Sequence, residues 1–373
     1  MKIAFLLSRI EQTGVTTHTL DLAQGLVEEG HKVCLITGGK IENATSRVDD
    51  FYNEFKALGV DIKEFKTPSG NIIKRAIQSI TSVFAIMREV KKCNPNVIHC
   101  QSPYMTFIPW LMGKKFTTTL HILYLKRNFK FKKPNHLIAI SNESYEFSKK
   151  MFRMEDKNLS LIHHGVSDRF SRPISLKQKL DLKKRFNISE NKLIIGFAGS
   201  ISLRKGSDIL VEALKDLTTS TKEKIHFIFL GGVKGSEDYI WLKDMVKNAG
   251  IQNFMTLVPF EDPKPFYDIF DIFVLPSRME SFPLVTLEAM MSECCPVRSN
   301  TEGAYEQIED GVNGLLFETE NTQQFTGILE KLVSDTSLRR LLAKNARTKA
   351  MNEFTIPVMT KKTLEVYSKI QMN

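Results

Sequence analysis

The chain has 373 residues, of which 42% are hydrophobic and 25% charged, and its formal net charge is +10. This length predicts two domains, and the composition is that of a globular chain rather than a disordered or fibrous one. The first apolar run, at residues 2–7, is broken by Ser8 and Arg9, and no run approaches the length of a spanning helix, so we expect neither a secretory signal nor a membrane span. Five cysteines, an odd number without metal-ligand spacing, indicate reduced thiols in a cytoplasmic protein.

The start of the chain predicts a doubly wound parallel sheet. Residues 2–7 are typical of a buried strand, residues 8–17 of a loop with a tight turn at Gly14, residues 19–29 of a helix, and residues 33–37 of a second strand. A strand, a helix and a strand in this order form the βαβ unit with which such sheets begin.

A longer helix is predicted over residues 72–90. Its apolar stripe consists of Ile73, Ile77, Ile80, Phe84 and Met87. A stripe at this spacing is usually packed against a core. The flanking basic residues leave a second interpretation open, in which the helix has a role at a membrane surface.

The strand predicted over residues 116–120 ends at His121. A histidine at the carboxyl end of a parallel strand is well placed for chemistry. The alternative is an interior histidine that is held by hydrogen bonds.

Residues 114–133 combine positive charge with aromatic side chains. The basic residues are Lys114, Lys115, Lys126, Arg127, Lys130, Lys132 and Lys133, and the aromatic ones are Phe116, Phe129 and Phe131. Residues 1–172 hold 26 Lys/Arg and 16 Asp/Glu, whereas residues 173–373 hold 26 of each, so the whole excess lies in the first half. We therefore expect an anionic partner for this half, and we hypothesise that residues 114–133 hold the protein on an anionic membrane surface. A solvated loop is the alternative, and nucleic acid is not expected because no recognised binding module accompanies the charge.

The second half begins after a polar connector at residues 168–190. A strand over residues 192–199 starts a second sheet. The loop that follows, residues 199–206, contains Ser200, Arg204 and Lys205.

The second half is organised around a strand that leads into a helix. The strand covers residues 269–275, and the helix covers residues 284–291, with Ser281 as its N-cap and Pro283 suited to its first turn. Backbone N–H groups near Phe282, Pro283 and Leu284 are then expected at the carboxyl edge of the sheet, where a helix N-terminus binds phosphate well.

Two glutamates frame this helix. Glu280 lies at its mouth, and Glu288 lies two turns past Ser281, on nearly the same side. In this position the two carboxylates can hold hydroxyls of a ligand whose phosphates contact the N–H groups. The alternative is an acid favoured by the helix dipole, together with a surface glutamate.

Glu280, seven residues, Glu288 and then Ala-Met resemble the E-x7-E motif of family-4 retaining glycosyltransferases of the GT-B fold. The loop at residues 199–206 is similar to the phosphate loop of that family. Further matching positions are Gly14, His18, residues 30–33, residues 99–102, His121, Pro296, Val297, Gly303, Glu306 and residues 310–317.

This resemblance implies an α/β fold with two Rossmann-like domains facing across a cleft. Residues 1–172 are expected to bind the acceptor, with the helix at 356–373 packing back onto them, and residues 190–355 are expected to bind a nucleotide-sugar. The implied reaction is hexosyl transfer with retention, from a nucleotide-diphosphate sugar (UDP-sugar favoured) to a cell-surface glycan, lipid-linked or polymer acceptor. No cofactor is implied, and a metal is not needed because no Asp-x-Asp motif occurs.

The resemblance also implies roles for individual residues. The catalytic set is His121, Lys205 and Glu280, and the donor-binding set is Gly14, Ser200, Arg204, Lys205, Phe282, Pro283, Leu284 and Glu288. Ser200 stands where the family usually has arginine, Thr13 where it has a second glycine, and His164 where it has asparagine. These departures leave open a catalytically degenerate protein that serves as a partner subunit. The expected location is the cytoplasm, at the inner face of the membrane.

Overall fold

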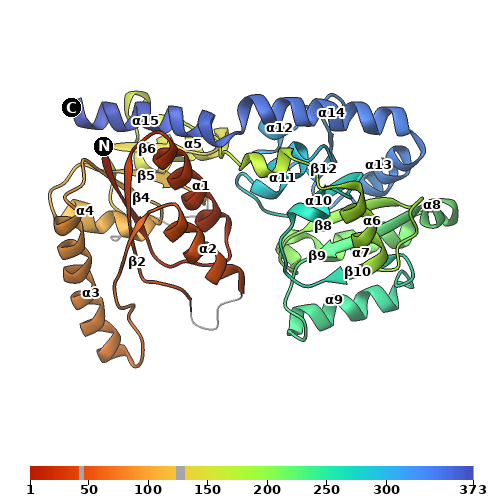
Figure 1. Cartoon of the computed structure of the whole chain (residues 1–373), viewed down its shortest axis with the longest axis horizontal. Coiled ribbons are helices and arrows are strands. Elements are labelled where there is room, and N and C mark those ends of the chain that lie inside the picture. The colour runs from red at the N-terminus through yellow and green to blue at the C-terminus, as the bar shows by residue number, and fades with distance from the viewer. Residues whose placement is uncertain (42–45, 123–130, 373) are drawn as a thin grey trace. The chain divides into compact units, whose positions relative to one another are not determined.

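The computed structural model describes residues 1–41, 46–122 and 131–372, which form two compact units (Figure 1). Unit 1 combines Met1–Gly165 with the last helix, Ile356–Met372, and unit 2 consists of Val166–Thr355. Each unit contains a parallel sheet of its own.

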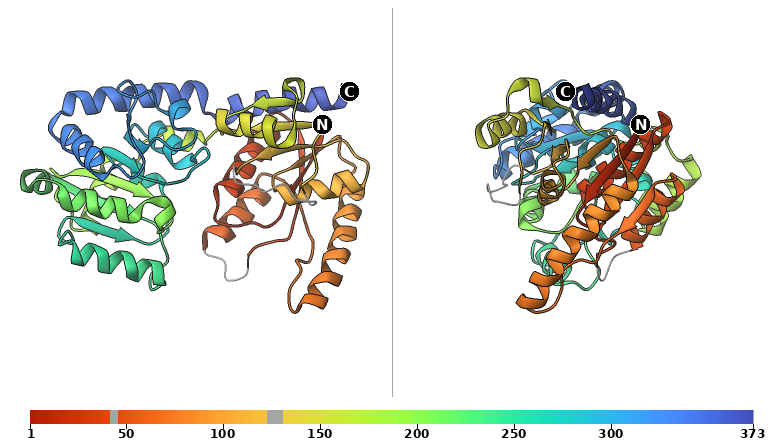
Figure 2. Two further views of the ribbon diagram at one scale, coloured as in Figure 1. Left: turned by 180° about the vertical axis from the view of Figure 1, so that it is seen from behind. Right: turned by 90° about the vertical axis from the view of Figure 1, so that its left-hand side faces the viewer.

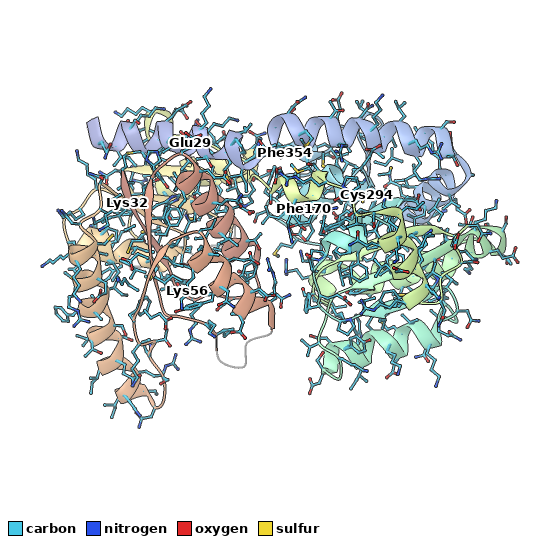
Figure 3. All side chains as sticks on the ribbon, viewed as in Figure 1. Glu29, Lys32, Lys56, Phe170, Cys294 and Phe354 are labelled. Carbon is cyan, nitrogen blue, oxygen red and sulfur yellow. The ribbon has the colours of Figure 1, made fainter. Side chains whose placement is uncertain are left out.

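The division between the units falls at residues 165 and 166, before the boundary predicted at residue 172. The residues in between pack within unit 2. The rings of Phe170 and Tyr267 lie 5.8 Å apart, and the hydroxyl of Ser292 donates a 2.9 Å hydrogen bond to the carbonyl of Phe170, which is labelled in Figure 3. The predicted connector also belongs to unit 2, where it contains the helix α6, Leu176–Arg185.

The sheet of unit 1 has the order β3-β2-β1-β4-β5-β6-β7 within the described residues, and all its neighbours pair in parallel. Its strands are β1 (Lys2–Leu7), β2 (Lys32–Thr37), β3 (Asp61–Glu64), β4 (Val97–Cys100), β5 (Thr117–Leu120), β6 (His136–Ala139) and β7 (Leu159–Leu161). Its helices are α1 (Gly14–Glu28), α2 (Ser46–Ala57), α3 (Ile72–Cys93), α4 (Phe107–Leu111), α5 (Asn142–Phe152) and α15 (Ile356–Met372). The strand order reverses between β1 and β4, as in a doubly wound sheet.

Helices cover both faces of this sheet because successive strand residues point to opposite sides. Ile3 and Phe5 of β1 pack with α1, α2 and α15, whereas Leu6 packs with α3 on the other face. Helices α1 and α15 lie so close that a Cβ at Gly25 would come within 2.0 Å of the Thr360 hydroxyl.

Helix α1 begins at Gly14, five residues before the predicted start at residue 19. Gly14 is therefore the first residue of a helix, and the tight turn predicted there is wrong. The sequence favours a loop because Val15, Thr16 and Thr17 are β-branched residues of low helix propensity. Thr16 is nonetheless buried, so tertiary packing overrides the local preference.

The sheet of unit 2 has the order β10-β9-β8-β11-β12-β13 and is also parallel. Its strands are β8 (Leu193–Ala198), β9 (Ile225–Leu230), β10 (Met255–Val258), β11 (Ile272–Leu275), β12 (Cys295–Ser299) and β13 (Leu315–Phe317). Besides α6, its helices are α7 (Ser207–Asp216), α8 (Thr219–Lys224), α9 (Glu237–Asn248), α10 (Lys264–Tyr267), α11 (Leu284–Met291), α12 (Ala304–Gln307), α13 (Thr322–Ser334) and α14 (Thr336–Glu353). The order reverses between β8 and β11, and ligands of such sheets bind at the carboxyl ends of the strands at this point. Both units are thus Rossmann-like, which confirms the predicted fold class.

Candidate active site

The loops that follow β8 and β11 meet at the switch point of unit 2. Gly206, at the end of the β8 loop, has φ of 70°, and a Cβ there would lie 1.9 Å from the carbonyl oxygen of Pro276. Only glycine combines this left-handed conformation with so close an approach of two backbones. The loop with Lys205 is therefore held directly against the loop that leads into α11.

Helix α11 has the bounds that the sequence predicts, Leu284–Met291. Its N-cap is Pro283 in an extended conformation, without a capping side chain, so the prediction of Ser281 as the cap is wrong. Pro283 therefore lies outside the first turn, although a proline is compatible with that position too. The N–H groups that helix geometry leaves without an intrahelical acceptor therefore begin at Leu284.

Lys205, which is partly buried, and Glu280, which is buried, form an ion pair at the mouth of this helix. The Lys205 Nζ lies 2.5 Å from Glu280 Oε1, and the Ser277 hydroxyl donates a 2.7 Å hydrogen bond to the same oxygen. The Glu280 residue is only 8% exposed. Burial alone raises the pKa of this carboxyl, but the Lys205 ammonium and the Ser277 hydroxyl outweigh burial and hold the pKa below its usual value. Glu280 is therefore ionised at neutral pH.

Glu288 lies on α11 and is also buried. Its Oε2 accepts a 2.9 Å hydrogen bond from the hydroxyl of Tyr267. Burial raises the pKa of Tyr267, and the neighbouring carboxylate raises it further, so the phenol remains a donor. Tyr267 thus orients the Glu288 carboxylate.

In unit 1, three histidines gather where strands of the sheet end. The ring of His18 lies 4.8 Å from that of His121 and 4.4 Å from that of His164, and the last two rings stack 5.5 Å apart. The Nε2 of His121 is 3.1 Å from the side-chain oxygen of Gln101. His121 is thus the sequence-predicted member of a cluster whose other two members are far apart in the chain.

All three imidazoles are buried and neutral at physiological pH. Burial lowers the pKa of His121 to about 3, and burial together with the neighbouring rings lowers the pKa values of His18 and His164 well below the usual value. Both ring nitrogens of His18 lack a hydrogen-bond partner among the described residues. Buried polar atoms of this kind are usually satisfied, so hydroxyls of a bound ligand suit this cluster. The described part of the chain contains no group of three or more His, Cys, Asp or Glu residues arranged to hold a metal ion.

Comparison with known families decides the class of the protein. The Glycosyltransferase Family 4 model matches residues 12–170, and the Glycosyl transferases group 1 model matches residues 178–349. The chain belongs to these glycosyltransferases.

Relatives of this glycosyltransferase match most of the chain. An uncharacterized glycosyltransferase of Methanocaldococcus jannaschii is 22% identical over 375 residues, which cover 95% of this chain and 94% of that one. The N,N'-diacetylbacillosaminyl-diphospho-undecaprenol alpha-1,3-N-acetylgalactosaminyltransferase of Campylobacter jejuni is 27% identical over 250 residues, or 66% of this chain and 63% of that one. The crystal structure of Anabaena HepE in complex with UDP and glucose matches 99% of this chain and 100% of that one, with a TM-score of 0.83 and 18% identity. The fold of the glycosyltransferase is therefore GT-B.

Ser200, Arg204 and Phe282 are also assigned to the donor site of the glycosyltransferase. Ser200 is exposed, and Arg204 is an exposed side chain that donates a 3.3 Å hydrogen bond to the carbonyl of Met279. Phe282 is buried, with its ring 5.8 Å from that of Phe354.

Sequence reasoning missed two arginines of the glycosyltransferase. Arg278 donates two hydrogen bonds to Asp208, at 2.7 and 2.8 Å, and one of 2.6 Å to the carbonyl of Leu203, so it ties the two site loops together. Arg298, fully buried on β12, contributes to the lowered pKa of Glu280. Arg278 lies two residues before Glu280 of the E-x7-E motif, but its partners are about 70 residues away, and nothing in the local pattern identifies them.

Proposed function

We propose that this glycosyltransferase moves a hexose, with retention at the anomeric carbon, from a nucleotide-diphosphate sugar to a glycan, lipid-linked or polymer acceptor. The observation that carries the proposal is the buried Lys205–Glu280 pair at the N-terminus of α11, with Glu288 farther along the same helix. This arrangement presents a cation, backbone N–H groups and two carboxylates at one switch point. It suits a diphosphate that links two groups with hydroxyls, the ribose of a nucleoside and a sugar.

In the proposed reaction, the departing diphosphate gains negative charge while the sugar gains oxocarbenium character. The Lys205 ammonium and the N–H groups from Leu284 onward stabilise the diphosphate, so that a metal ion is not required. Glu280 holds sugar hydroxyls and Glu288 the ribose. In unit 1, His121 is the proposed catalytic residue and Gly14 a proposed donor-binding residue. UDP is the favoured nucleotide, in keeping with the UDP and glucose bound to the structurally similar HepE.

A lipid-linked acceptor is favoured among the three acceptor classes. The name of the Campylobacter relative specifies a diphospho-undecaprenol acceptor, and a protein that uses such an acceptor works at a membrane. The peripheral association predicted for residues 114–133, at the inner face of the membrane, stays a proposal. Residues 123–130 of this stretch lie outside the described residues. Lys114, Lys115 and Lys133 are exposed, whereas Phe116 and Phe131, two of the aromatic residues of this stretch, pack in the core.

The proposal is tested first by thermal unfolding in the presence of each nucleotide diphosphate. A ligand at a hundred times its dissociation constant adds about 2.7 kcal/mol of stability, so the recognised base is identified by the largest shift. Proton NMR of the transfer product then reports the anomeric configuration. A product with inverted configuration would refute the retaining mechanism, and the lack of a shift with any nucleotide diphosphate would refute the donor site.

A second candidate function is that of a degenerate partner subunit. Ser200, exposed where the family usually carries arginine, favours it because one cation of the phosphate loop is missing. Slow hydrolysis of a nucleotide-sugar in the absence of acceptor separates the two functions. A catalytic protein releases sugar at a rate that falls in Lys205→Ala, whereas a degenerate subunit binds the donor and releases none.

A further inference from the structure

Helix α3 has two apolar faces, and only one of them is packed against the protein. The buried positions in its C-terminal half are Ser82, Ile86, Glu89, Val90 and Cys93. The stripe of Ile73, Ile77, Ile80 and Phe84 lies about 180° around the helix from these positions, given 3.6 residues per turn. Its side chains are 58–74% exposed.

The first turns of α3 stand clear of the sheet of unit 1. Figures 1 and 2 show the helix extending past the other helices of this unit, beside the loop that leads into it. Ile72, at its start, is 86% exposed. Asn71 caps the helix by accepting a hydrogen bond from the Lys74 N–H, and Ser82 ties it to the loop through a hydrogen bond to the Lys66 carbonyl. The stripe is therefore held in helical form without burying its apolar side.

The charge around the stripe is positive. Between residues 66 and 93 the chain has six basic residues, Lys66, Lys74, Arg75, Arg88, Lys91 and Lys92, and one acidic residue, Glu89. Glu89 is buried and paired with Lys92 at 3.0 Å and with Arg88 at 3.1 Å. An approaching surface thus meets isoleucine, phenylalanine and an excess of lysine and arginine over acidic residues.

We propose that α3 is an interfacial helix, whose Ile73–Ile77–Ile80–Phe84 stripe inserts into the surface of an anionic lipid bilayer while its basic residues contact the lipid headgroups. An exposed apolar stripe flanked by Lys and Arg is the feature by which helices lie in the membrane interface. No helix within the described ranges is long and apolar enough to cross a membrane, so this contact is peripheral. The inference goes beyond the proposed function, because it holds for any acceptor and does not depend on catalysis.

An acidic protein groove or a second copy of this chain are the other occupants that an apolar helix face accepts. A second copy is disfavoured by charge, because it would bring two sets of basic residues together. A bilayer surface rich in anionic lipid fits both the apolar stripe and the charge.

The test is sedimentation of the purified protein with vesicles of phosphatidylglycerol and phosphatidylcholine, and with vesicles of phosphatidylcholine alone. We expect binding to the anionic vesicles that weakens with salt. The double variant Ile77→Glu/Ile80→Glu should bind at least about tenfold more weakly, since two apolar side chains no longer leave water. The matched control is Leu176→Glu/Leu341→Glu, which changes two exposed leucines of unit 2, 72% and 55% exposed, by the same chemistry and should bind as the wild type does.

Two further measurements make the result specific to α3. Phe84→Trp should show a blue-shifted emission with anionic vesicles, and brominated lipid should quench it, beyond the change in the wild type with its two tryptophans. Analytical ultracentrifugation without lipid tests the second copy as the occupant. Equal binding of the α3 variant and the control, an unshifted emission from the tryptophan introduced in Phe84→Trp, or a dimer abolished by Ile77→Glu/Ile80→Glu would each overturn the proposal.

Discussion

Replacement of Lys205 by methionine should destabilise unit 2 even when no substrate is bound. The change leaves Glu280 buried without the cation that lies 2.5 Å from its carboxylate. Removal of one partner from a buried pair costs about 3–5 kcal/mol. We expect the lower end, about 3 kcal/mol, because the hydrogen bond from Ser277 and the charge of Arg298 remain. For a unit of this size the unfolding midpoint then falls by roughly 6–12 °C.

The loss should depend on pH. In the wild type the pKa of Glu280 lies below its usual value, so the pair stabilises the fold above the ordinary glutamate pKa and loses its effect as the pH falls through the lower folded value. In Lys205→Met, burial has no nearby ammonium to oppose it and raises the pKa of Glu280. Protonation then relieves the buried charge, and the difference between variant and wild type narrows as the pH is lowered from 7 toward 5.

Differential scanning calorimetry of Lys205→Met, Glu280→Gln and the double variant, at pH 7 and pH 5, measures both effects. The double variant should recover about 1–3 kcal/mol relative to the sum of the single changes. Arg204→Met is the control, since its exposed side chain only contacts a carbonyl, and it should change stability by less than about 0.5 kcal/mol. Additive losses at both pH values would refute the buried pair. In turnover, Lys205→Ala should cost roughly a hundredfold, and a larger loss from Arg204→Ala would show that this loop is misaligned with the family.

Three other perturbations have defined outcomes. In calorimetric titration, Glu288→Ala should weaken binding of the nucleotide diphosphate itself, whereas Glu280→Ala should lose only the sugar-dependent part of the affinity; equal losses for both ligands would refute this division of roles. Tyr267→Phe removes the hydrogen bond that orients Glu288 and should lower nucleotide affinity by roughly tenfold, and unchanged affinity would mean that Glu288 needs no such support. The stability of unit 1 should fall as the pH drops below about 6.5, because the unfolded chain binds protons that the buried His18 and His121 do not; His121→Asn should flatten this dependence of the unfolding midpoint, and an unchanged slope would contradict it.

The motif helix shows what the sequence predicts well. Residues 284–291 are bounded by strong local signals, a proline before the helix and a continuous apolar run, and the structure gives the same bounds. The predicted cap is wrong because Pro283 is extended, and local sequence signals do not distinguish a proline at the cap from a proline in the first turn. The pairing of Lys205 with Glu280 is implied only by family resemblance, since the two residues are 75 positions apart.

The packing partners of an apolar face could not be predicted from the sequence, because a periodic pattern shows that a helix face is apolar but not what covers it. The spacing of the predicted α3 stripe is typical of core packing. Its last member, Met87, does pack against the core of unit 1, but its other four members are exposed, and Ile86 and Val90 enter the core from the opposite side of the helix. Phe116 and Phe131 stand among basic residues in the sequence, yet both are buried. His18 lies on α1 and His164 lies after β7, and only the fold of unit 1 makes them neighbours of His121.

The membership of α15 in unit 1 has a consequence for biosynthesis. This helix supplies Tyr367, whose hydroxyl lies 2.7 Å from the Nδ1 of His99 on β4, and Ile370, which joins the same core as β1. The ribosome synthesises α15 only after all of unit 2. Unit 2 is a continuous segment and can therefore fold first, while unit 1 still exposes the apolar surface that α15 will cover. The first half of the nascent chain is therefore the part most in need of a chaperone, and a premature stop after residue 355 would spare the fold of unit 2 and leave unit 1 open to proteolysis.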